Sequence, residues 1–248
     1  MAELIRKQGG RPFVAPALRE VPLEDNDPTF RFAERLFAGE FDMMMLLTGV
    51  GTRQLSRVLA ARYPARAFAD ALGRLAVVAR GPKPVAALRE MGIVPTVAAP
   101  EPNTWRELLA ATATRPERRI AVQEYGRSNP ELLDGLRARG AEVTPVRVYQ
   151  YGMPEDLEPL REAARRLAAG EIDAALFTTA VQIEHLARAA REQGIEEAAL
   201  AALRRCPVGS IGPTTTEALE EFGVHPAFEP SHPKMGILVR EAAGRFHS

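Results

Sequence analysis

The chain has 248 residues, of which 46% are hydrophobic and 26% charged, and this length and composition fit a globular protein with two cores of roughly 100–150 residues each. Thirty-two Lys and Arg residues balance 32 Asp and Glu residues, so the chain lacks the basic excess of a nucleic-acid-binding protein. The single Cys206 excludes an internal disulfide and a thiolate metal cluster, and we expect a buried or idle thiol. No apolar run approaches the roughly 18 residues of a membrane span and no signal core opens the chain, so we expect a cytoplasmic protein without a membrane partner.

Short apolar runs alternate with amphipathic stretches, which is typical of βα units around a mainly parallel sheet. In chain order the sequence predicts strands at 43–47, 75–79, 120–122, 143–148, 174–177 and 208–211. Helices are predicted through 54–59 and over 83–91, 130–139 and 214–222, and the last three are each followed by a glycine that ends the helix.

The second half of the chain repeats the first. Asp42 and Asp173, Thr48 and Thr179, and Gly81 and Gly212 all lie 131 positions apart, and further pairs keep this offset without a gap. A period this long indicates a duplicated domain rather than a solenoid of short repeats. The segment 42–102 is therefore related to 173–233, and we expect two similar lobes.

The repeat also indicates that a strand is missing. The opening helix and a strand predicted at 12–15 correspond to 130–139 and 143–148, but the strand at 120–122 has no counterpart before Met1. In a doubly wound sheet the first strand is commonly central, so its loss would leave an unpaired edge and an uncovered apolar face. Either the start codon used lies downstream of the natural one or another segment fills the gap.

Five motifs together resemble the uroporphyrinogen-III synthase family over nearly the whole chain. They are Leu47-Thr48-Gly49-Val50-Gly51, Arg80-Gly81-Pro82-Lys83, Val148-Tyr149-Gln150, Phe177-Thr178-Thr179-Ala180-Val181 and Ile211-Gly212-Pro213-Thr214-Thr215. The resemblance implies an α/β protein of two lobes, each a doubly wound, flavodoxin-like parallel sheet flanked by helices. Residues 1–20 and 152–248 would form lobe one and 28–144 lobe two, with extended linkers near 14–27 and 144–153 that are rich in proline.

The resemblance implies an activity as well as a fold. It implies a cofactor-independent, cyclising carbon–oxygen lyase that converts hydroxymethylbilane, a linear tetrapyrrole, to uroporphyrinogen III with loss of water and inversion of ring D through a spiro intermediate. Such a reaction depends chiefly on positioning a flexible substrate, so it requires neither a metal nor strong acid–base groups. A monomer that receives its substrate from hydroxymethylbilane synthase is the simplest expectation.

The sequence is also compatible with two other functions. A non-catalytic protein of the same fold could bind a tetrapyrrole or another polyanion, and the missing strand favours that alternative. A nucleotide-dependent enzyme is the third possibility, but Gly49-Val50-Gly51 lacks the third glycine of the dinucleotide fingerprint.

Candidate site residues come from the turns that follow predicted strands. Helix N-termini there offer unpaired N–H groups to the carboxylates of the substrate, although the threonines could equally be ordinary helix caps. The family motifs and these turns give the following substrate-binding set: Thr48, Gly49, Val50, Gly81, Lys83, Gly126, Arg127, Ser128, Thr178, Thr179, Ala180, Gly212, Thr214 and Thr215.

Tyr149 matches the tyrosine of the linker motif in the family and is the candidate catalytic residue. Its neutral phenol could donate a hydrogen bond to the leaving hydroxyl, or it could simply pack against Tyr151. We expect His185 to be an exposed helix residue rather than a ligand, and Trp105 and Met43–Met45 to be core residues.

Overall fold

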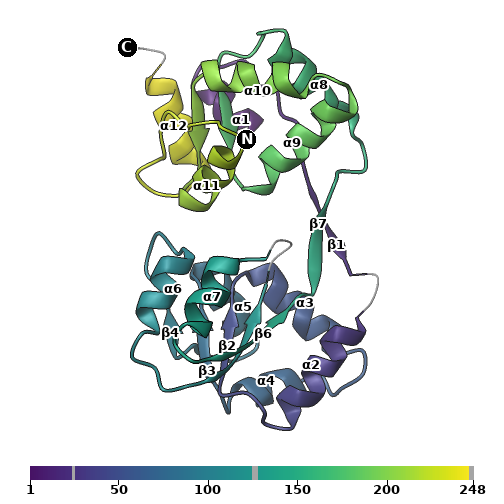
Figure 1. The fold of residues 1–248 in the computed structure, drawn as a ribbon, viewed down its shortest axis with the longest axis vertical. Helices are drawn as coiled ribbons and strands as arrows, with labels where there is room; N and C mark the ends of the chain where they lie inside the picture. Colours follow the sequence, from purple (N-terminus) through teal and green to yellow (C-terminus); the bar gives the residue numbers. More distant parts are fainter. Residues whose placement is uncertain (24–25, 125–127, 246–248) are drawn as a thin grey trace. The chain divides into compact units, whose positions relative to one another are not determined.

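The computed structural model describes residues 1–23, 26–124 and 128–245, and their contacts divide the chain into two compact units (Figure 1). Unit 1 comprises Met1–Arg19 and Gly152–Ser248, and unit 2 comprises Glu20–Tyr151. None of the helices within the described ranges has the length and apolar character that a membrane crossing requires.

Unit 2 is built on a five-stranded parallel sheet in the order β4-β3-β2-β5-β6. Its strands are β2 (Met43–Leu46), β3 (Ala76–Ala79), β4 (Val97–Ala98), β5 (Arg119–Gln123) and β6 (Glu142–Val146). In the register of the sheet Met44 lies between Val77 and Ala121, so β2 is the central strand and all four of its residues are buried. The predicted strands at 43–47, 75–79 and 120–122 and the predicted methionine core are confirmed.

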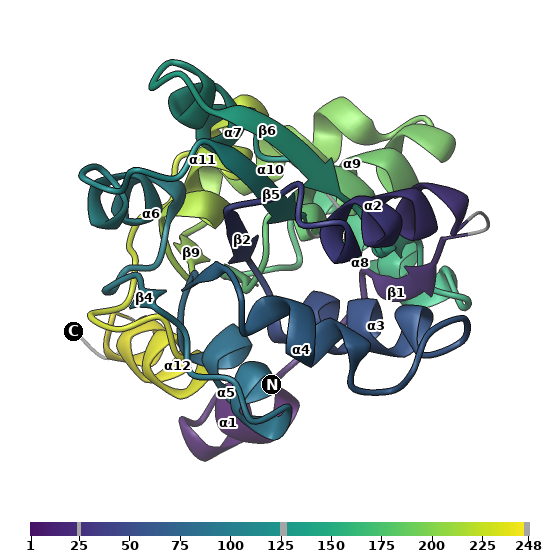
Figure 2. The ribbon, with the colours of Figure 1, turned by 90° about the horizontal axis from the view of Figure 1, so that it is seen from below.

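Helices cover both faces of this sheet, as Figure 2 shows from below. One face packs against α2 (Asp27–Phe37), α3 (Gly49–Leu59), α4 (Ala67–Leu72) and α5 (Pro82–Glu90), and the other against α6 (Trp105–Ala111) and α7 (Pro130–Arg137). Burial of each large apolar side chain in these layers contributes about 1.5–3 kcal/mol. Local signals set the helix starts: the Asn129 side chain, for example, accepts a hydrogen bond from the Leu132 N–H at 3.0 Å, and Pro130 occupies the first turn of α7.

Unit 1 has a smaller sheet of parallel strands, β8 (Ala175–Phe177) and β9 (Val208–Ser210), with an isolated parallel bridge from Gly209 to Phe228. Its helices are α1 (Ala2–Lys7), α8 (Glu158–Ala168), α9 (Val181–Glu192), α10 (Glu196–Arg205), α11 (Pro213–Glu221) and α12 (Met235–Gly244). The core of one face joins β8 and β9 to α8, α9, α10 and α11. The other face is covered by α12, which also contacts α1.

The structure confirms the duplication element by element. Helix α8 begins and ends 131 positions after α2, and α11 begins and ends 131 positions after α5. The bridge between Gly209 and Phe228 repeats, at the same offset, the pairing of Val78 with Val97 in unit 2. Gly140 and Gly9, which follow α7 and α1, also share the offset, and both adopt a positive φ of about 80° that favours glycine.

The copies differ where the sequence predicts the missing strand. No strand corresponds to β5 in the described part of unit 1, and the strand predicted at 12–15 is wrong, because residues 10–18 form no strand. The physical reason lies in unit 2: β6, the counterpart of residues 11–15, pairs with β5, and without that partner its ladder cannot form. The unit 2 sheet is doubly wound, because the chain enters it at the central strand β2 and places two strands on each side of that strand.

The two segments in which the sequence predicts extended connections contain β1 (Arg19–Pro22) and β7 (Tyr149–Gly152). These strands pair with each other in a separate two-stranded sheet. The Arg19 guanidinium also donates to the Met153 carbonyl at 3.2 Å and to Glu155 at 2.8 Å.

Candidate functional site

The turn after β2 carries the best-defined group of predicted site residues. The Thr48 hydroxyl accepts a hydrogen bond from the Gly51 N–H at 3.0 Å, so this threonine caps α3. Gly49 and Val50 supply the first N–H groups of that helix, which have no acceptor within the helix and can meet an anion. Val50 is exposed at the start of α3.

Close packing brings a second predicted turn beside the first. A Cβ on Gly49 would lie 2.6 Å from the Lys83 carbonyl oxygen, so only glycine lets the starts of α3 and α5 approach this closely. Gly81 is the N-cap of α5, and Lys83 is exposed in its first turn. Thr48, Gly49, Val50, Gly81 and Lys83 therefore lie together at the carboxyl edge of the unit 2 sheet, where α/β proteins bind ligands.

Tyr149 is joined to this edge by a hydrogen bond. Its hydroxyl lies 3.2 Å from the Thr48 hydroxyl, and its ring packs edge-on against Tyr151 with the ring centroids 5.5 Å apart. Only 2% of Tyr149 is exposed, and this burial raises the pKa of the phenol above its ordinary value of 10.0. Tyr149 is thus a neutral hydrogen-bonding group at physiological pH, and Thr48 is the less buried member of the pair.

Two polar residues at the end of β5 are missing from the sequence prediction. Gln123, fully buried, accepts a hydrogen bond from the Thr48 N–H at 3.3 Å. Glu124, 2% exposed, accepts from the Ser128 hydroxyl at 2.7 Å and from Arg147 at 3.2 Å. Both residues directly follow an apolar run, so the rule that sites lie at the carboxyl ends of parallel strands could have found them.

Of the three site residues predicted at 126–128, after β5, Ser128 lies within the described part of the chain. Ser128 is half-buried and lies at the Glu124 carboxylate. Gly126 and Arg127 lie outside the described residues.

The corresponding turn of unit 1 is arranged differently from the Thr48 turn. Thr179 does not cap α9, whose N-cap is Ala180 without a side-chain hydrogen bond. Instead the Gln182 side chain accepts from the N–H groups of Thr178 at 2.6 Å and Thr179 at 3.2 Å. The cap interpretation is therefore wrong for Thr179, because the N–H of Gln182, the second residue of α9, donates to the Thr179 carbonyl rather than to its hydroxyl.

The turn after β9 presents mainly backbone. Gly212 is the N-cap of α11, and neither Thr214 nor Thr215 caps it, because both lie inside the helix. Thr215 is 4% exposed and Thr214 is half-buried, so Thr214 is the more accessible hydroxyl.

Three other residues considered from the sequence, His185, Cys206 and Trp105, are half-buried in the fold. The exposed position expected for His185 is wrong: the ring is half-buried and its Nδ1 lies 2.6 Å from the Ala17 carbonyl. Cys206 is half-buried, and burial raises the pKa of its thiol. Trp105 packs against the unit 2 core with its indole N–H unpaired. The described residues contain no cluster of three or more His, Cys, Asp or Glu side chains that could hold a metal.

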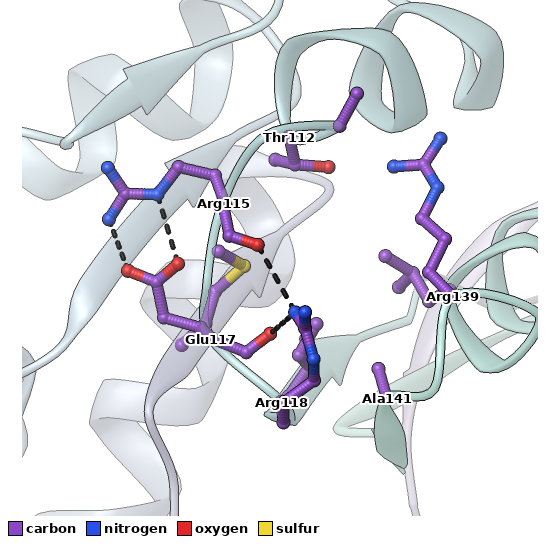
Figure 3. Close-up of a pocket in the computed structure, with 10 residues that line it drawn as sticks. Thr112, Arg115, Glu117, Arg118, Arg139 and Ala141 are labelled. Carbon is purple, nitrogen blue, oxygen red and sulfur yellow. Dashed lines mark hydrogen bonds and ion pairs between the residues drawn. The ribbon is translucent and has the colours of Figure 1, made fainter.

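A small cavity of about 170 Å³ lies at the opposite, amino end of the unit 2 sheet (Figure 3). Its arginines are engaged by the protein itself. Arg115 pairs with Glu117, and Arg118 donates to two backbone carbonyls at 3.1–3.2 Å. Arg139 donates to the Leu109 carbonyl at 2.6 Å. These arginines therefore stabilise the surrounding loop by bonds to protein acceptors, and we do not assign the cavity as an anion site.

Fold and site together define a two-unit, doubly wound α/β protein that presents helix N-termini at the carboxyl edges of its sheets. The sequence profile described as "Uroporphyrinogen-III synthase HemD" matches residues 1–240. The chain therefore belongs to the uroporphyrinogen-III synthase family, as its motifs predict, and family membership places it in tetrapyrrole biosynthesis.

Individual relatives agree with this assignment. The chain is 31% identical to the uncharacterised protein YjjA of Bacillus subtilis (strain 168), over 98% of this chain and 90% of that protein. It is also 31% identical to a putative uroporphyrinogen-III synthase of Methanothermobacter thermautotrophicus, over 90% of this chain and 84% of that protein. A crystal structure of a mutant uroporphyrinogen III synthase from the extremely thermophilic bacterium Thermus thermophilus matches with a TM-score of 0.73 and 28% identity, covering 99% of this chain and 94% of that one.

Proposed function

We propose that the chain converts hydroxymethylbilane to uroporphyrinogen III and water. The ring A hydroxyl leaves with a proton as water and gives an azafulvene, which the substituted carbon of ring D attacks to form a spiro pyrrolenine. Fragmentation, reclosure with ring D inverted and loss of one ring proton complete the reaction. The spontaneous reaction closes without inversion, so the catalytic task is to hold the geometry that favours one closure.

The observation that carries this proposal is the pair of turns gathered at the carboxyl edge of the unit 2 sheet. The N–H groups of Gly49 and Val50 at the start of α3, with the N–H and ammonium of Lys83 at the start of α5, form a donor set suited to carboxylates, of which the substrate has eight. Lys83 provides the N–H in the first turn of α5 because its neighbours Pro82 and Pro84 have none. We assign substrate binding also to Thr178, Thr179 and Ala180 at the start of α9 and to Gly212, Thr214 and Thr215 at the start of α11. Because Gln182 accepts from the N–H groups of Thr178 and Thr179, the threonine hydroxyls would be the donors at α9. Gly126, Arg127 and Ser128 complete the proposed binding set.

We assign the leaving-group step to Tyr149. Its phenol keeps its proton because burial raises the pKa, and a neutral donor can assist departure of the hydroxyl without placing a buried charge beside the carboxylates. The Thr48 hydroxyl lies 3.2 Å from the phenol oxygen and forms a hydrogen bond with it. Because the ring A carbon–oxygen bond breaks with loss of water as the macrocycle closes, the proposed activity is that of a cyclising carbon–oxygen lyase, and its chemistry needs no external cofactor.

A coupled assay tests this function. Hydroxymethylbilane synthase supplies the substrate, and the rate of uroporphyrinogen III formation is followed as the concentration of the chain is varied. A rate proportional to the chain and unchanged after dialysis against a chelator supports the cofactor-independent reaction. A rate that falls with the chelator and returns with a metal ion would contradict it.

A further inference from the structure

Glu124 places a carboxylate inside unit 2, directly after the carboxyl end of β5. Its side chain is 3% exposed and accepts hydrogen bonds from the Ser128 hydroxyl at 2.7 Å and from the Arg147 Nε at 3.2 Å. A buried carboxylate is costly unless a cation and further donors compensate its charge. The cation here belongs to Arg147, whose side chain is 58% exposed. The pair therefore connects the interior of the unit to its surface.

Arg147 uses only part of its guanidinium to hold Glu124. Arg53, for comparison, directs its Nε and Nη2 to both carboxylate oxygens of Glu90, at 2.7 and 2.6 Å. Arg147 donates through Nε, and its two Nη groups have no acceptor among residues 1–23, 26–124 and 128–245. Two Nη groups form a planar edge that binds a carboxylate by two parallel hydrogen bonds. Arg147 therefore has a carboxylate-binding edge that the described protein does not fill.

The position of Arg147 is fixed from two sides. Its backbone carbonyl accepts from the hydroxyl of Thr29 in α2 at 3.2 Å, and Thr29 is 1% exposed. Its guanidinium is held by Glu124, whose own N–H donates to the Val146 carbonyl at 2.9 Å. A side chain that is already restrained loses less rotamer entropy when it binds a ligand. Arg147 is thus preorganised for an anion, although it lies at the surface.

Arg147 lies at the same sheet edge as the Thr48 turn. The last residues of β2, β5 and β6 are in register, so the residues that follow them leave the sheet together. Two strand spacings put Arg147 roughly 10 Å from the Thr48 turn. The Thr48 N–H donates to the Gln123 side chain at 3.3 Å, and the Gln123 amide donates to the Glu124 carbonyl. Hydrogen bonds between neighbouring strands therefore connect the two positions.

We propose that Arg147 binds a carboxylate of the substrate and that Glu124 is the residue that positions it. This inference rests on the proposed function, which supplies a flexible ligand with eight carboxylates. A second contact roughly 10 Å from the Thr48 turn restricts how the rings of that ligand can rotate. Glu124 offsets part of the charge of Arg147, but it occupies a different edge of the guanidinium. We therefore expect a moderate contribution to affinity, of about tenfold.

Binding measured apart from turnover tests the role of Arg147. Uroporphyrinogen III, kept reduced, is an octacarboxylate that can be added directly and followed by equilibrium dialysis. Arg147→Gln should raise its Kd and the KM for hydroxymethylbilane about tenfold, with kcat within about twofold of the parent. The matched control Arg137→Gln removes the same charge from an exposed arginine of α7 in the same unit and should change neither constant. Equal effects of the two variants, or a parent that does not bind uroporphyrinogen III, would overturn the proposal.

The two readouts distinguish this proposal from the proposed function. A parent that binds uroporphyrinogen III but forms no type III isomer would refute the synthase activity, and the comparison of Kd values would still decide the role of Arg147. An active parent whose Kd and KM are unchanged by Arg147→Gln would refute the carboxylate contact alone.

A double-mutant cycle tests Glu124 as the positioning residue. Glu124→Gln keeps the shape of the side chain and an oxygen that can accept from Arg147, but it loosens the guanidinium by removing the charge. It should raise the Kd about threefold in the parent and leave it unchanged in the Arg147→Gln background. An equal rise in both backgrounds would show a purely structural role. A Kd that falls in the parent would show that Glu124 only offsets the charge of Arg147, and either result would overturn the positioning role.

Discussion

Replacing Tyr149 with phenylalanine removes one hydroxyl and the 3.2 Å hydrogen bond to Thr48, and it leaves the ring contact with Tyr151 in place. The folding cost is small, because one neutral hydrogen bond contributes about 1 kcal/mol. That loss lowers the melting temperature of a chain this long by about 2–4 °C. The catalytic loss is larger, since a positioned proton donor contributes about 100-fold or more to kcat.

Rates of uroporphyrinogen III formation, measured with substrate generated in the assay, separate the two effects. Tyr149→Phe should lower kcat about 100-fold with little change in KM. The control Thr48→Val removes the same hydrogen bond and the cap of α3, which costs about 1 kcal/mol, but it keeps the phenol and should act mainly on KM. Equal losses of kcat in the two variants would assign Tyr149 a purely structural role, and an unchanged kcat in Tyr149→Phe would remove it from the mechanism.

Three further changes test the remaining account. The Arg119 side chain, followed by its backbone N–H, lowers the pKa of Asp42 from 3.8 to about 2, so this carboxylate stabilises the fold above pH 3.8 and the effect is lost as the pH falls through 2. Asp42→Asn should therefore lower the free energy of unfolding by about 1 kcal/mol at pH 7 after solvent screening. In denaturant titrations the difference between the parent and the variant should shrink toward pH 2, and a difference independent of pH would contradict the assignment. Gly51→Ala should destabilise unit 2 by about 1–2 kcal/mol, because overlap with Gln123 outweighs the helix propensity of alanine, and a melting temperature at or above that of the parent would refute the packing argument. Thr215→Val should raise the fraction of uninverted isomer, and an unchanged isomer ratio would exclude this residue from the site.

The duplication is the part of the fold that the sequence predicts best. Gly–Pro turns and helix-ending glycines depend on local backbone geometry, so Gly81 and Gly212 mark equivalent helix starts before any contact is known. The strand at 12–15 fails for the opposite reason. Its correspondence to the strand at 143–148 predicts a strand, but a strand also needs a neighbour to pair with, and no strand beside it is found among the described residues.

The site is predicted less completely than the fold. Thr48 and Thr179 are equivalent in sequence, yet only the first caps its helix. The Gly51 N–H donates to the Thr48 hydroxyl, whereas the N–H of the corresponding residue, Gln182, donates to the Thr179 carbonyl. The burial of Tyr149 and Glu124 depends on helices packed from distant parts of the chain, which residue spacing does not encode.

The assignment of activity rests on the isomer that the chain produces. The decisive measurement supplies enzymatically generated hydroxymethylbilane to the purified 248-residue chain, oxidises the products and separates type I from type III uroporphyrin. The account predicts an excess of type III that grows with the amount of chain added. Type I alone, at every concentration of chain, would contradict the proposed synthase activity of this chain.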